Sequence, residues 1–458
     1  MSLTSVIKNF RKHVKRTLFT TPSHNQGSFI VPESRKYIGR KYYRTDFSEI
    51  DGFDNLREPL ECIKESLSKA SEIYNSSETF FLINGSSSGM IALFLACLNP
   101  RDKVVINRNA HICVCSALTI SGVEPVWMDA KTDDEWGIML PPAAGDIENT
   151  IKKNPGVKAV IITSPTYEGL PADVAEISKV CKEYNVILIV DEAHGALWNF
   201  SENFPLTAID MGADASVQSL HKTAGAINPA ALLHLGKESK IVPSKVQEAL
   251  NLINTSSPSY PLLANIEHTI EFLASPKGGK EIDKLLSNIR NFHKEVLQYD
   301  NVSIFCIGND ITKILVKIDD VSGYALENCL YNDFNIEVEL ENSKSIMCLT
   351  GVGTTKGKLK KLQKALCKIA KNPEMAKKYE TEVKDPQYEK PVLACTPYQA
   401  LRANSAPVEL NNAVDKISKY NHIAYPPGVP FLFAGEIIKQ EHIDYLKQHC
   451  EKIEIIVK

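Results

Sequence analysis

The sequence predicts an α/β protein built on a mostly parallel sheet, and three observations support this class. Short apolar runs that read as strands alternate with segments that read as helices across residues 79–235. The runs are apolar throughout, which is typical of parallel strands covered by helices on both faces. Polar residues with useful chemistry follow several runs, at the carboxyl ends of strands, where such sheets bind ligands.

The elements are predicted in chain order from these patterns. Strands are expected at 79–84, 103–106, 125–128, 159–163, 186–190, 215–218 and 230–235. Helices are expected at about 59–74, 90–98 and 172–184. After Pro258 the pattern changes to helices at 262–274 and, beyond a polar break at 276–280, up to residue 297. Strands near 302–307, 313–318, 336–340 and 345–349 then predict a smaller α/β lobe.

These changes in pattern predict four parts. They are an N-terminal arm (1–45), a large cofactor-binding domain (46–270), a small α/β domain (271–372) and a C-terminal domain (373–458), with a charged linker at 371–390. Residues 1–20 are basic and amphipathic. A transit peptide or a membrane-surface helix would have this pattern, but we favour an arm that packs on a partner subunit.

Composition excludes several classes of function. The 458 residues are 43% hydrophobic and 23% charged, and the net charge of −3 favours neither nucleic acid nor membrane as a partner. No apolar run approaches the length of a membrane span. The 11 cysteines are scattered, which predicts reduced thiols in a cytoplasmic protein. The pattern His111-x-Cys113-x-Cys115 lacks a second ligand pair, so we expect no metal.

Lys222 is the first candidate for a catalytic residue. It follows a predicted strand in the polar run Ser219-Leu-His221-Lys222, and Asp191 ends another strand 31 positions earlier (222 minus 191). Alone, Lys222 would be a solvated charge and Asp191 a helix cap. Together they suit pyridoxal phosphate, which needs a lysine for its covalent link and a carboxylate for its ring nitrogen.

A second group of residues suits the phosphate of that cofactor. Ser86, Ser87 and Ser88 lie in the run Gly85-Ser-Ser-Ser-Gly89, between a strand and an apolar helix. Backbone N–H groups and hydroxyls at such a turn bind anions, and the run is neither a Walker loop nor GxGxxG. A simple capped turn is the alternative. His111 follows the next strand, where its ring can stack on a planar cofactor.

Two acidic regions are candidates for binding a cationic substrate. Asp46, Glu49, Asp51 and Asp54 fall within nine positions, so they are either solvated helix-capping acids or an anionic lip. The second region runs from Ala424 to Glu436 and contains Pro-Pro-Gly-Val-Pro, where prolines fix an extended course before Glu436.

Over nearly its whole length the chain resembles the fold-type-I, pyridoxal-phosphate-dependent ornithine/lysine/arginine decarboxylases, in their short bacterial form. The motifs that carry the resemblance are Thr21-Pro-Ser-His-Asn-Gln-Gly27, Asn84-Gly-Ser-Ser-Ser-Gly89, Arg108-Asn-Ala-His111, Ser164-Pro-Thr-Tyr-Glu-Gly169, Asp191-Glu-Ala-His194, Gln218-Ser-Leu-His-Lys222, Thr255-Ser-Ser-Pro-Ser-Tyr260 and Tyr425-Pro-Pro-Gly-Val-Pro430. The resemblance implies an aspartate-aminotransferase-like large domain and smaller C-terminal α/β lobes.

The resemblance also implies roles for individual residues. Lys222 would carry the cofactor, Asp191 would pair with its ring nitrogen, and His111 and Ala193 would lie on opposite faces of the ring. The phosphate would be held by Ser86, Ser87, Ser219 and, nearby, His221, with Ser88 and His194 also at the cofactor. Thr255 would reach the phosphate of the neighbouring subunit, which implies a homodimer or a higher even oligomer with shared active sites.

The sequence departs from the family pattern at three places. Ser23-His24-Asn25 replaces Gly-His-Lys, Ser86 replaces Thr, and Lys419-Tyr420-Asn421 replaces a segment that commonly contains Ala-Glu. The third change removes an acid near the substrate end.

The predicted reaction is decarboxylation of a basic amino acid for polyamine biosynthesis, with arginine, converted to agmatine, as the first choice. Glu436 and the acids at 46, 49, 51 and 54 would bind the cationic end, since a carboxylate pairs with a guanidinium through two parallel hydrogen bonds. Lysine and ornithine remain alternatives. So do an aminotransferase or aldolase and a non-catalytic polyamine sensor, although an intact Asp191–Lys222 pair argues against the sensor.

Overall fold

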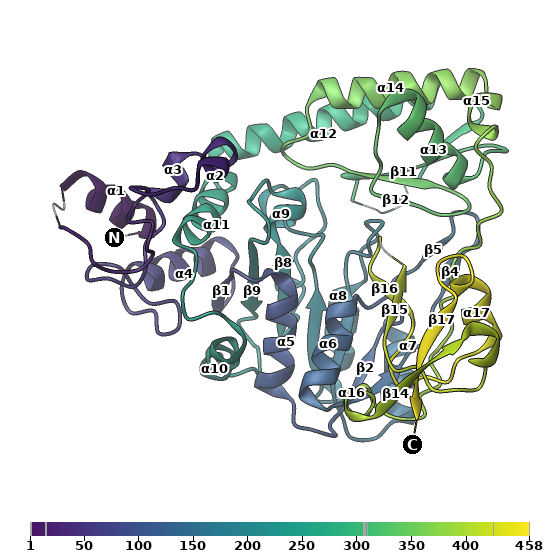
Figure 1. Cartoon of the computed structure of the whole chain (residues 1–458), viewed down its shortest axis with the longest axis horizontal. Coiled ribbons are helices and arrows are strands. Elements are labelled where there is room, and N and C mark those ends of the chain that lie inside the picture. The colour runs from purple at the N-terminus through teal and green to yellow at the C-terminus, as the bar shows by residue number, and fades with distance from the viewer. Residues whose placement is uncertain (1, 14–15, 306–307, 309, 425, 458) are drawn as a thin grey trace.

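The computed structural model describes residues 2–13, 16–305, 308, 310–424 and 426–457. At its centre is a seven-stranded sheet with the order β1-β9-β8-β7-β6-β2-β3 (Figure 1). Its strands are β1 (Glu78–Leu82), β2 (Lys103–Ile106), β3 (Glu124–Trp127), β6 (Val157–Thr163), β7 (Ile187–Asp191), β8 (Ala215–Ser219) and β9 (Ala231–Leu235). β9 runs antiparallel to β1 and β8, and the other neighbours are parallel. The predicted α/β class with a mostly parallel sheet is confirmed.

Helices cover both faces of this sheet because its strands are apolar on both sides. Ile161 and Ile189 pack in the cluster with α5 (Gly85–Cys97), α6 (Ile112–Ser121) and α10 (Pro243–Ile253). Their neighbours Val160 and Leu188 point the other way, into the cluster with α7 (Ala144–Lys153) and α8 (Val174–Glu183). Alternate residues of a strand face opposite sides, so a continuous apolar run serves two cores.

A second sheet lies beyond the large one, at the top of Figure 1. Its order is β10-β11-β13-β12, and all its strand pairs are antiparallel. The strands are β10 (Val302–Ile304), β11 (Lys313–Ile318), β12 (Leu340–Glu341) and β13 (Ile346–Leu349), accompanied by helices α12 (Pro276–Val296), α13 (Gly323–Phe334) and α14 (Lys356–Lys371).

Two elements of this region differ from the sequence prediction. The predicted polar break at 276–280 is the first turn of α12, since Pro276 suits that position and the hydroxyl of Ser275 accepts a hydrogen bond from Gly278 N at 3.2 Å. The predicted strand at 336–340 is also wrong for most of its length, because regular pairing begins only at Leu340.

The C-terminal segment forms two small two-stranded sheets. β14 (Asn404–Glu409) pairs with β17 (Lys452–Val457), and β15 (His422–Ala424) pairs with β16 (Val429–Leu432). Arg108 fixes this segment to the large sheet: its Nε donates to Glu389 O at 2.6 Å and its Nη1 to Pro430 O at 2.7 Å. The remaining short elements here and in the linker are α15 (Glu374–Lys377), α16 (Pro397–Arg402), η2 (Leu410–Asn412) and α17 (Gln440–Leu446).

The N-terminal helix α1 (Leu3–His13) packs on its own chain. Leu3, Ile7 and Phe10 are buried, and α1 contacts α4 (Cys62–Ile73) and α11 (Tyr260–Leu273). Thr4 N donates to the buried carboxylate of Glu267 at 2.9 Å. The arm as far as residue 13 therefore has an intrachain support that the sequence did not predict.

The rest of the arm is more exposed than α1. The helices α2 (Pro32–Tyr37) and α3 (Arg40–Tyr43) bury none of their residues, and Phe29 and Tyr37 are largely exposed. Elsewhere, β4 (Thr132–Asp133) and β5 (Ile138–Met139) form a hairpin, and η1 (Trp198–Phe200) follows β7. None of the helices in the described part of the chain combines the length and apolar character needed to span a membrane.

Candidate active site

Lys222 lies in the single turn α9 (Leu220–Thr223), immediately after β8 ends at Ser219. Its amine is half-buried against the loop that follows the neighbouring strand β7. The Nζ atom is 2.8 Å from Nε2 of His194 and 6.0 Å from the centroid of the Tyr167 ring. The structure thus brings Lys222 to the carboxyl end of the sheet, among the motifs that follow β6 and β7.

The surroundings of Lys222 desolvate its amine. Burial lowers the pKa of Lys222 below its ordinary value, and the negative charge of Asp191 opposes this shift only in part. A desolvated lysine with a depressed pKa is the form that attacks carbonyl compounds. Charged and titratable groups from separate parts of the chain act on this amine, among them Asp191, Cys113, Glu339 and Lys313.

Asp191 is the last residue of β7 and pairs in register with Thr163 on β6 and Val217 on β8. Only 4% of its surface is exposed. One carboxylate oxygen, Oδ1, accepts a hydrogen bond from Ala193 N at 3.2 Å, and Sγ of Cys113 lies 3.8 Å from the other, Oδ2. These contacts orient a buried carboxylate that can hold a protonated ring nitrogen.

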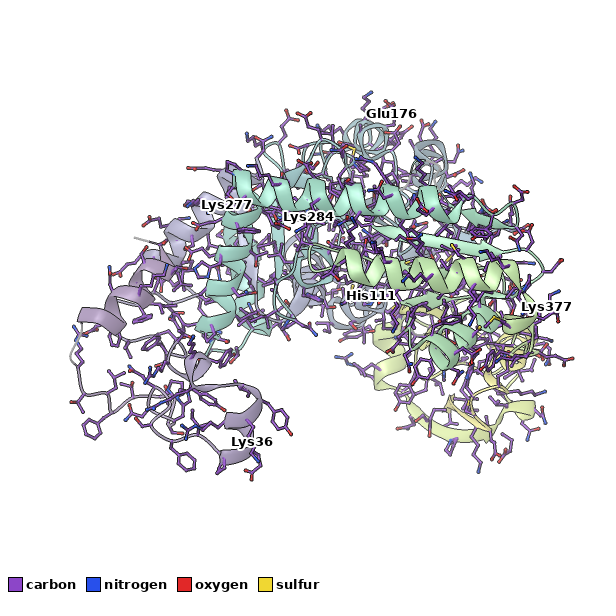
Figure 2. The ribbon with its side chains drawn as sticks, turned by 90° about the horizontal axis from the view of Figure 1, so that it is seen from above. Lys36, His111, Glu176, Lys277, Lys284 and Lys377 are labelled. Carbon is purple, nitrogen blue, oxygen red and sulfur yellow. The ribbon has the colours of Figure 1, made fainter. Side chains whose placement is uncertain are left out.

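Two histidines flank this carboxylate and amine. His111 caps α6, with Nδ1 accepting from Cys113 N at 3.2 Å, and burial lowers its pKa. Figure 2 labels it near the middle of the view, and its side chain is half-buried. His194 is 5% exposed, and burial together with the charge of Lys222 holds its pKa well below the ordinary value. Both rings are therefore neutral at physiological pH and can stack or exchange a proton.

The serine-rich run forms the first turn of α5, five residues earlier than predicted, and Gly85 at its start takes a left-handed φ of +76°. No side chain caps this helix, so its first N–H groups are available to an anion. Ser86 and Ser87 are half-buried there, and the Ser219 hydroxyl donates to Oγ of Ser86 at 2.8 Å. This arrangement brings the ends of β1 and β8 together and suits a phosphate group.

The other predicted phosphate residues have defined positions nearby. The Ser88 hydroxyl donates to Gly85 O at 2.8 Å and is buried within the turn. His221 lies next to Lys222, with Nδ1 3.0 Å from Ala230 O, and burial lowers its pKa. Its other ring nitrogen is therefore the one that can meet a ligand.

The small sheet contributes contacts that the sequence reasoning missed. Lys313, at the start of β11, donates from Nζ to His194 O at 2.6 Å and to Oδ2 of Asp310 at 2.7 Å. The backbone N–H of Val352 donates to Thr223 O at 3.0 Å. The small sheet thus contacts the segments on both sides of the Lys222 amine. The sequence feature that could have pointed to this contact is a charged residue at the start of an apolar strand, as in Lys313-Ile-Leu-Val.

Thr255 and the acidic run have contacts of their own in this chain. Thr255 is exposed, and its hydroxyl accepts only from Ser257 N, at 3.1 Å, among the described contacts. Asp46 pairs with His24 at 3.1 Å, and Asp51 lies 3.9 Å from Arg16.

Asp54 serves as a helix cap. Its carboxylate accepts hydrogen bonds from the backbone N–H groups of Asn55, Leu60, Glu61, Ile63 and Lys64, at 2.8–3.2 Å. Burial raises the pKa of Asp54, but these donors outweigh it and leave the pKa below its ordinary value. Of the two interpretations of the acidic run, capping describes Asp54. Glu49 differs, because its buried Oε1 has no partner among the described residues.

Glu436 is buried in the C-terminal segment, with 2% of its surface exposed. Its Oε2 accepts from Phe433 N at 2.8 Å, and its Oε1 lies 4.0 Å from Nε2 of His442. Burial raises its pKa to about 7, and the charge of Arg108 opposes that rise. These contacts give Glu436 a place in the C-terminal core, and its predicted contact with the substrate stays a prediction. Tyr425, which opens the Pro-Pro-Gly motif, lies outside the described residues.

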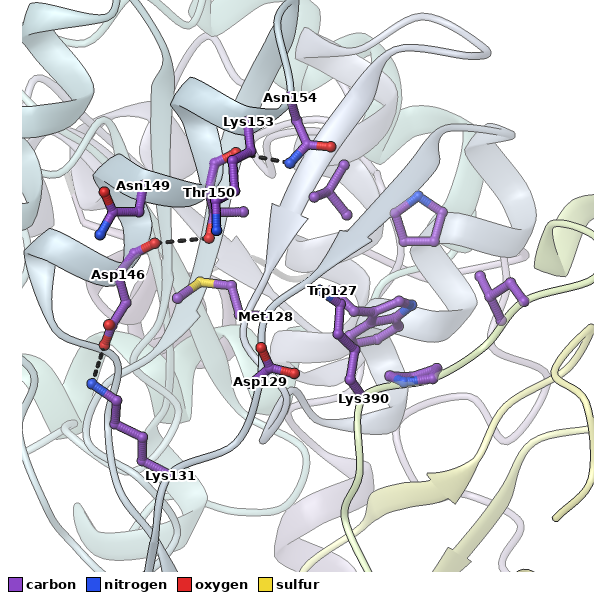
Figure 3. A pocket seen from close by; sticks show the side chains of 14 residues that line it. Trp127, Met128, Asp129, Lys131, Asp146, Asn149, Thr150, Lys153, Asn154 and Lys390 are labelled. Atoms are coloured by element: carbon purple, nitrogen blue, oxygen red, sulfur yellow. Dashed lines mark hydrogen bonds and ion pairs between the residues drawn. The ribbon is translucent and has the colours of Figure 1, made fainter.

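A separate pocket of about 590 Å³ lies between α7 and the C-terminal segment (Figure 3). Trp127, Asn149 and Lys390 line it, and Lys131 forms an ion pair with Asp146 at its edge. No residue of the predicted active site lines this pocket. In the described part of the chain, no three His, Cys, Asp or Glu side chains are grouped as metal ligands would be.

The fold defines the class of protein: the large, mostly parallel sheet with its smaller second sheet is the fold of the fold-type-I enzymes. The lysine decarboxylase LdcF of Francisella novicida shares this fold. Its structure superimposes with a TM-score of 0.85 at 19% identity, covering 99% of this chain and 81% of the other. Lysine decarboxylase A of Pseudomonas aeruginosa gives 0.82 at 17% identity, with coverages of 99% and 80%.

Sequence comparison places the chain more closely. The major domain of the Orn/Lys/Arg decarboxylase family matches residues 3–317, and the C-terminal domain of that family matches residues 375–455. The chain belongs to this family of decarboxylases. Arginine decarboxylase of Bacillus subtilis is 30% identical over 465 aligned residues, which cover 98% of this chain and 94% of the relative. Arginine decarboxylase of Bacillus anthracis is also 30% identical, with coverages of 96% and 92%.

Proposed function

We propose that the protein decarboxylates L-arginine to agmatine with pyridoxal phosphate as its cofactor. The observation that carries the proposal is the arrangement of Lys222 and Asp191: a desolvated amine and an oriented, buried carboxylate at the ends of neighbouring strands. When bound, pyridoxal phosphate supplies an electron sink for the bond to the leaving carboxylate. The rest of the chemistry belongs to side chains of this chain.

The residues around Lys222 would each bind a different group of that cofactor or act on the substrate. The free N–H groups of α5, with Ser86, Ser87 and Ser219, would bind the phosphate. Asp191 would keep the ring nitrogen protonated, and His111 and Ala193 would hold the two faces of the ring. Lys222, once released by the substrate amine, or a nearby histidine would return a proton to the α carbon.

The positions of the arginines in the second half of the chain support decarboxylation rather than transamination as the reaction. An aminotransferase usually clamps the substrate carboxylate with an arginine of the small domain. Two arginines follow Lys222 in the sequence, and both are exposed: Arg290 donates to Asn203, and Arg402 stacks on Tyr398. Neither is in contact with the Lys222 cluster in the described structure, so the substrate carboxylate is left without such a clamp.

Arginine is proposed before lysine and ornithine because full-length relatives at 30% identity carry the name arginine decarboxylase. The test is to incubate the purified protein with each of the three amino acids and to identify the amine formed. Agmatine should form fastest, and the Lys222→Ala variant should form none. If cadaverine or putrescine forms faster, the substrate assignment is wrong and the decarboxylase assignment stands.

We also propose that the active site is completed in a cytoplasmic homodimer, which can assemble into higher even oligomers. Thr255 is exposed and has no described contact with Ser86 at the start of α5 in its own chain. This is what we expect of a residue that reaches the active site of a partner subunit. The arm exposes large apolar side chains without cover, including Phe19, Phe29 and Tyr37. In Figure 2 the arm, marked by Lys36, and the C-terminal segment extend to one side of the large sheet, with His111 between them.

The predicted domains, with bounds at residues 45, 270 and 372, remain part of this proposal. The two sheets support them, because the large sheet ends with β9 and the small one begins with β10, separated by α10 to α12.

A further inference from the structure

Glu339 is an acid of the small sheet that faces the Lys222 cluster. Its backbone N–H donates to Met347 O at 2.9 Å, immediately before β12, and this bond fixes the direction of the segment. Its carboxylate oxygen Oε1 accepts a hydrogen bond from the phenol of Tyr167. The side chain is half-buried, so it is held in place and still open to a ligand.

Tyr167 connects this carboxylate to the reactive amine. Its ring lies 4.5 Å from the ring of His194, and its centroid is 6.0 Å from Nζ of Lys222. The phenol at the far end of the ring reaches Glu339. Burial lowers the pKa of Lys222, and the negative charge of Glu339 is among the groups that oppose this shift, in keeping with the path of contacts through Tyr167.

The order of groups from Lys222 through Tyr167 to Glu339 suits a basic amino acid. The α-amine of the substrate would take the place of the Lys222 amine, and the cationic group of a basic amino acid is several bonds further along its side chain. The Tyr167 ring offers an apolar wall to the methylene groups, and a carboxylate stands at the end of that wall. A carboxylate that accepts one hydrogen bond from a phenol retains sites for further donors.

We propose that Glu339, oriented by Tyr167, is the specificity-determining carboxylate that binds the cationic end of the substrate. This inference rests on the proposed decarboxylation of a basic amino acid. It assigns to the small sheet the task that the sequence suggested for Glu436. A guanidinium can pair with Glu339 through two parallel hydrogen bonds, and an ammonium through one.

A competing explanation is that Tyr167 and Glu339 only brace the small sheet against the large one. Agmatine and butylamine separate the two explanations, because they differ only in the guanidinium and share the amine that meets the cofactor. Titration calorimetry of the holoenzyme gives the ratio of their dissociation constants. The ratio reports the binding of the cationic group and cancels any general change in the cofactor site.

In Glu339→Gln, the preference for agmatine over butylamine should fall roughly 30-fold, the effect of removing one partner of a hydrogen-bonded charge pair. The KM for arginine should rise with it, and the cofactor absorption band should not change. Tyr167→Phe should reduce the preference less, since it removes only the group that orients the carboxylate. Glu337→Gln, an exposed residue two positions earlier, is the matched control and should keep the wild-type ratio.

A wild-type ratio in Glu339→Gln would overturn the inference, even if thermal stability fell. If Glu339→Gln does not fold, Tyr167→Phe decides, because an unchanged ratio there would equally contradict the role of the pair. Failure of the proposed function is a different result: the wild-type protein would then decarboxylate none of the three basic amino acids.

Discussion

The amine of Lys222 and the ring of His194 lie within hydrogen-bond distance, with 2.8 Å between Nζ and Nε2. His194 is in turn held through its carbonyl oxygen by Lys313 of the small sheet, at 2.6 Å. Lys222 is therefore positioned by contacts that involve residues of both sheets.

Asp191→Asn should keep the shape of the site and remove the charge that holds the ring nitrogen protonated. The cofactor should still bind, more weakly, and kcat should fall by about 100-fold or more, as expected for the loss of a preorganised charge at a reacting centre. Absorption spectra and steady-state kinetics on the same preparation measure both effects. Near-normal turnover would mean that Asp191 is only a structural residue at the end of β7.

Lys313→Met should destabilise the protein by about 3–5 kcal/mol, because it leaves the carboxylate of Asp310 buried without its partner. Both side chains of the pair are at most 1% exposed. The double variant Asp310→Asn/Lys313→Met removes both charges and should recover part of the loss. Denaturant unfolding gives the free energies.

The control for this pair is Lys317→Met, on the same strand, whose partner Glu135 is largely exposed. It should change the free energy of unfolding by about 1 kcal/mol or less. An equal loss in Lys313→Met and Lys317→Met would contradict the role given to the buried pair.

Mixing two inactive variants tests the shared site. Lys222→Ala and Thr255→Ala, combined under conditions of subunit exchange, should recover activity beyond either parent, since a mixed dimer contains one site with both residues intact. Mass spectrometry of the native assembly verifies the exchange. If exchange occurs and no activity returns, each site is built within one chain.

Glu436 should make stability depend on pH. Its pKa is raised from 4.5 to about 7, so the folded protein keeps a proton that the unfolded chain releases between these values. The free energy of unfolding should therefore fall as pH rises through this window, by about 3 kcal/mol from this group. Glu436→Gln should flatten that part of the pH profile. If Glu436→Gln instead leaves the profile unchanged and raises the KM for arginine, the predicted substrate contact is supported.

Much of the fold followed from local pattern. The strand ending at Asp191 and the strand before Lys222 are apolar runs, and their buried positions serve two cores. Local sequence pattern gave wrong element bounds where helix capping or long-range strand pairing determines the structure. Pro276 to Lys280 read as a break, yet the hydroxyl of Ser275 starts a helix there.

The positions of candidate site residues could be predicted from the sequence where the residue follows a strand. Lys222, Asp191, His111 and the serine run all lie at strand ends, so their convergence follows from the parallel sheet. Lys313 and Glu339 could not be predicted, because their contacts depend on how the second sheet docks on the first. Glu436 drew attention as an acid behind a rigid segment, and its burial depends on the same kind of long-range packing.

The central claim is that Lys222 carries the cofactor. Borohydride reduction of the holoenzyme, followed by proteolysis and mass spectrometry, fixes the cofactor to whichever lysine holds it. The pyridoxyl label should be on the peptide that contains Lys222, and the Lys222→Ala variant should carry no label. A label on any other lysine, or an equal label in Lys222→Ala, would contradict the account.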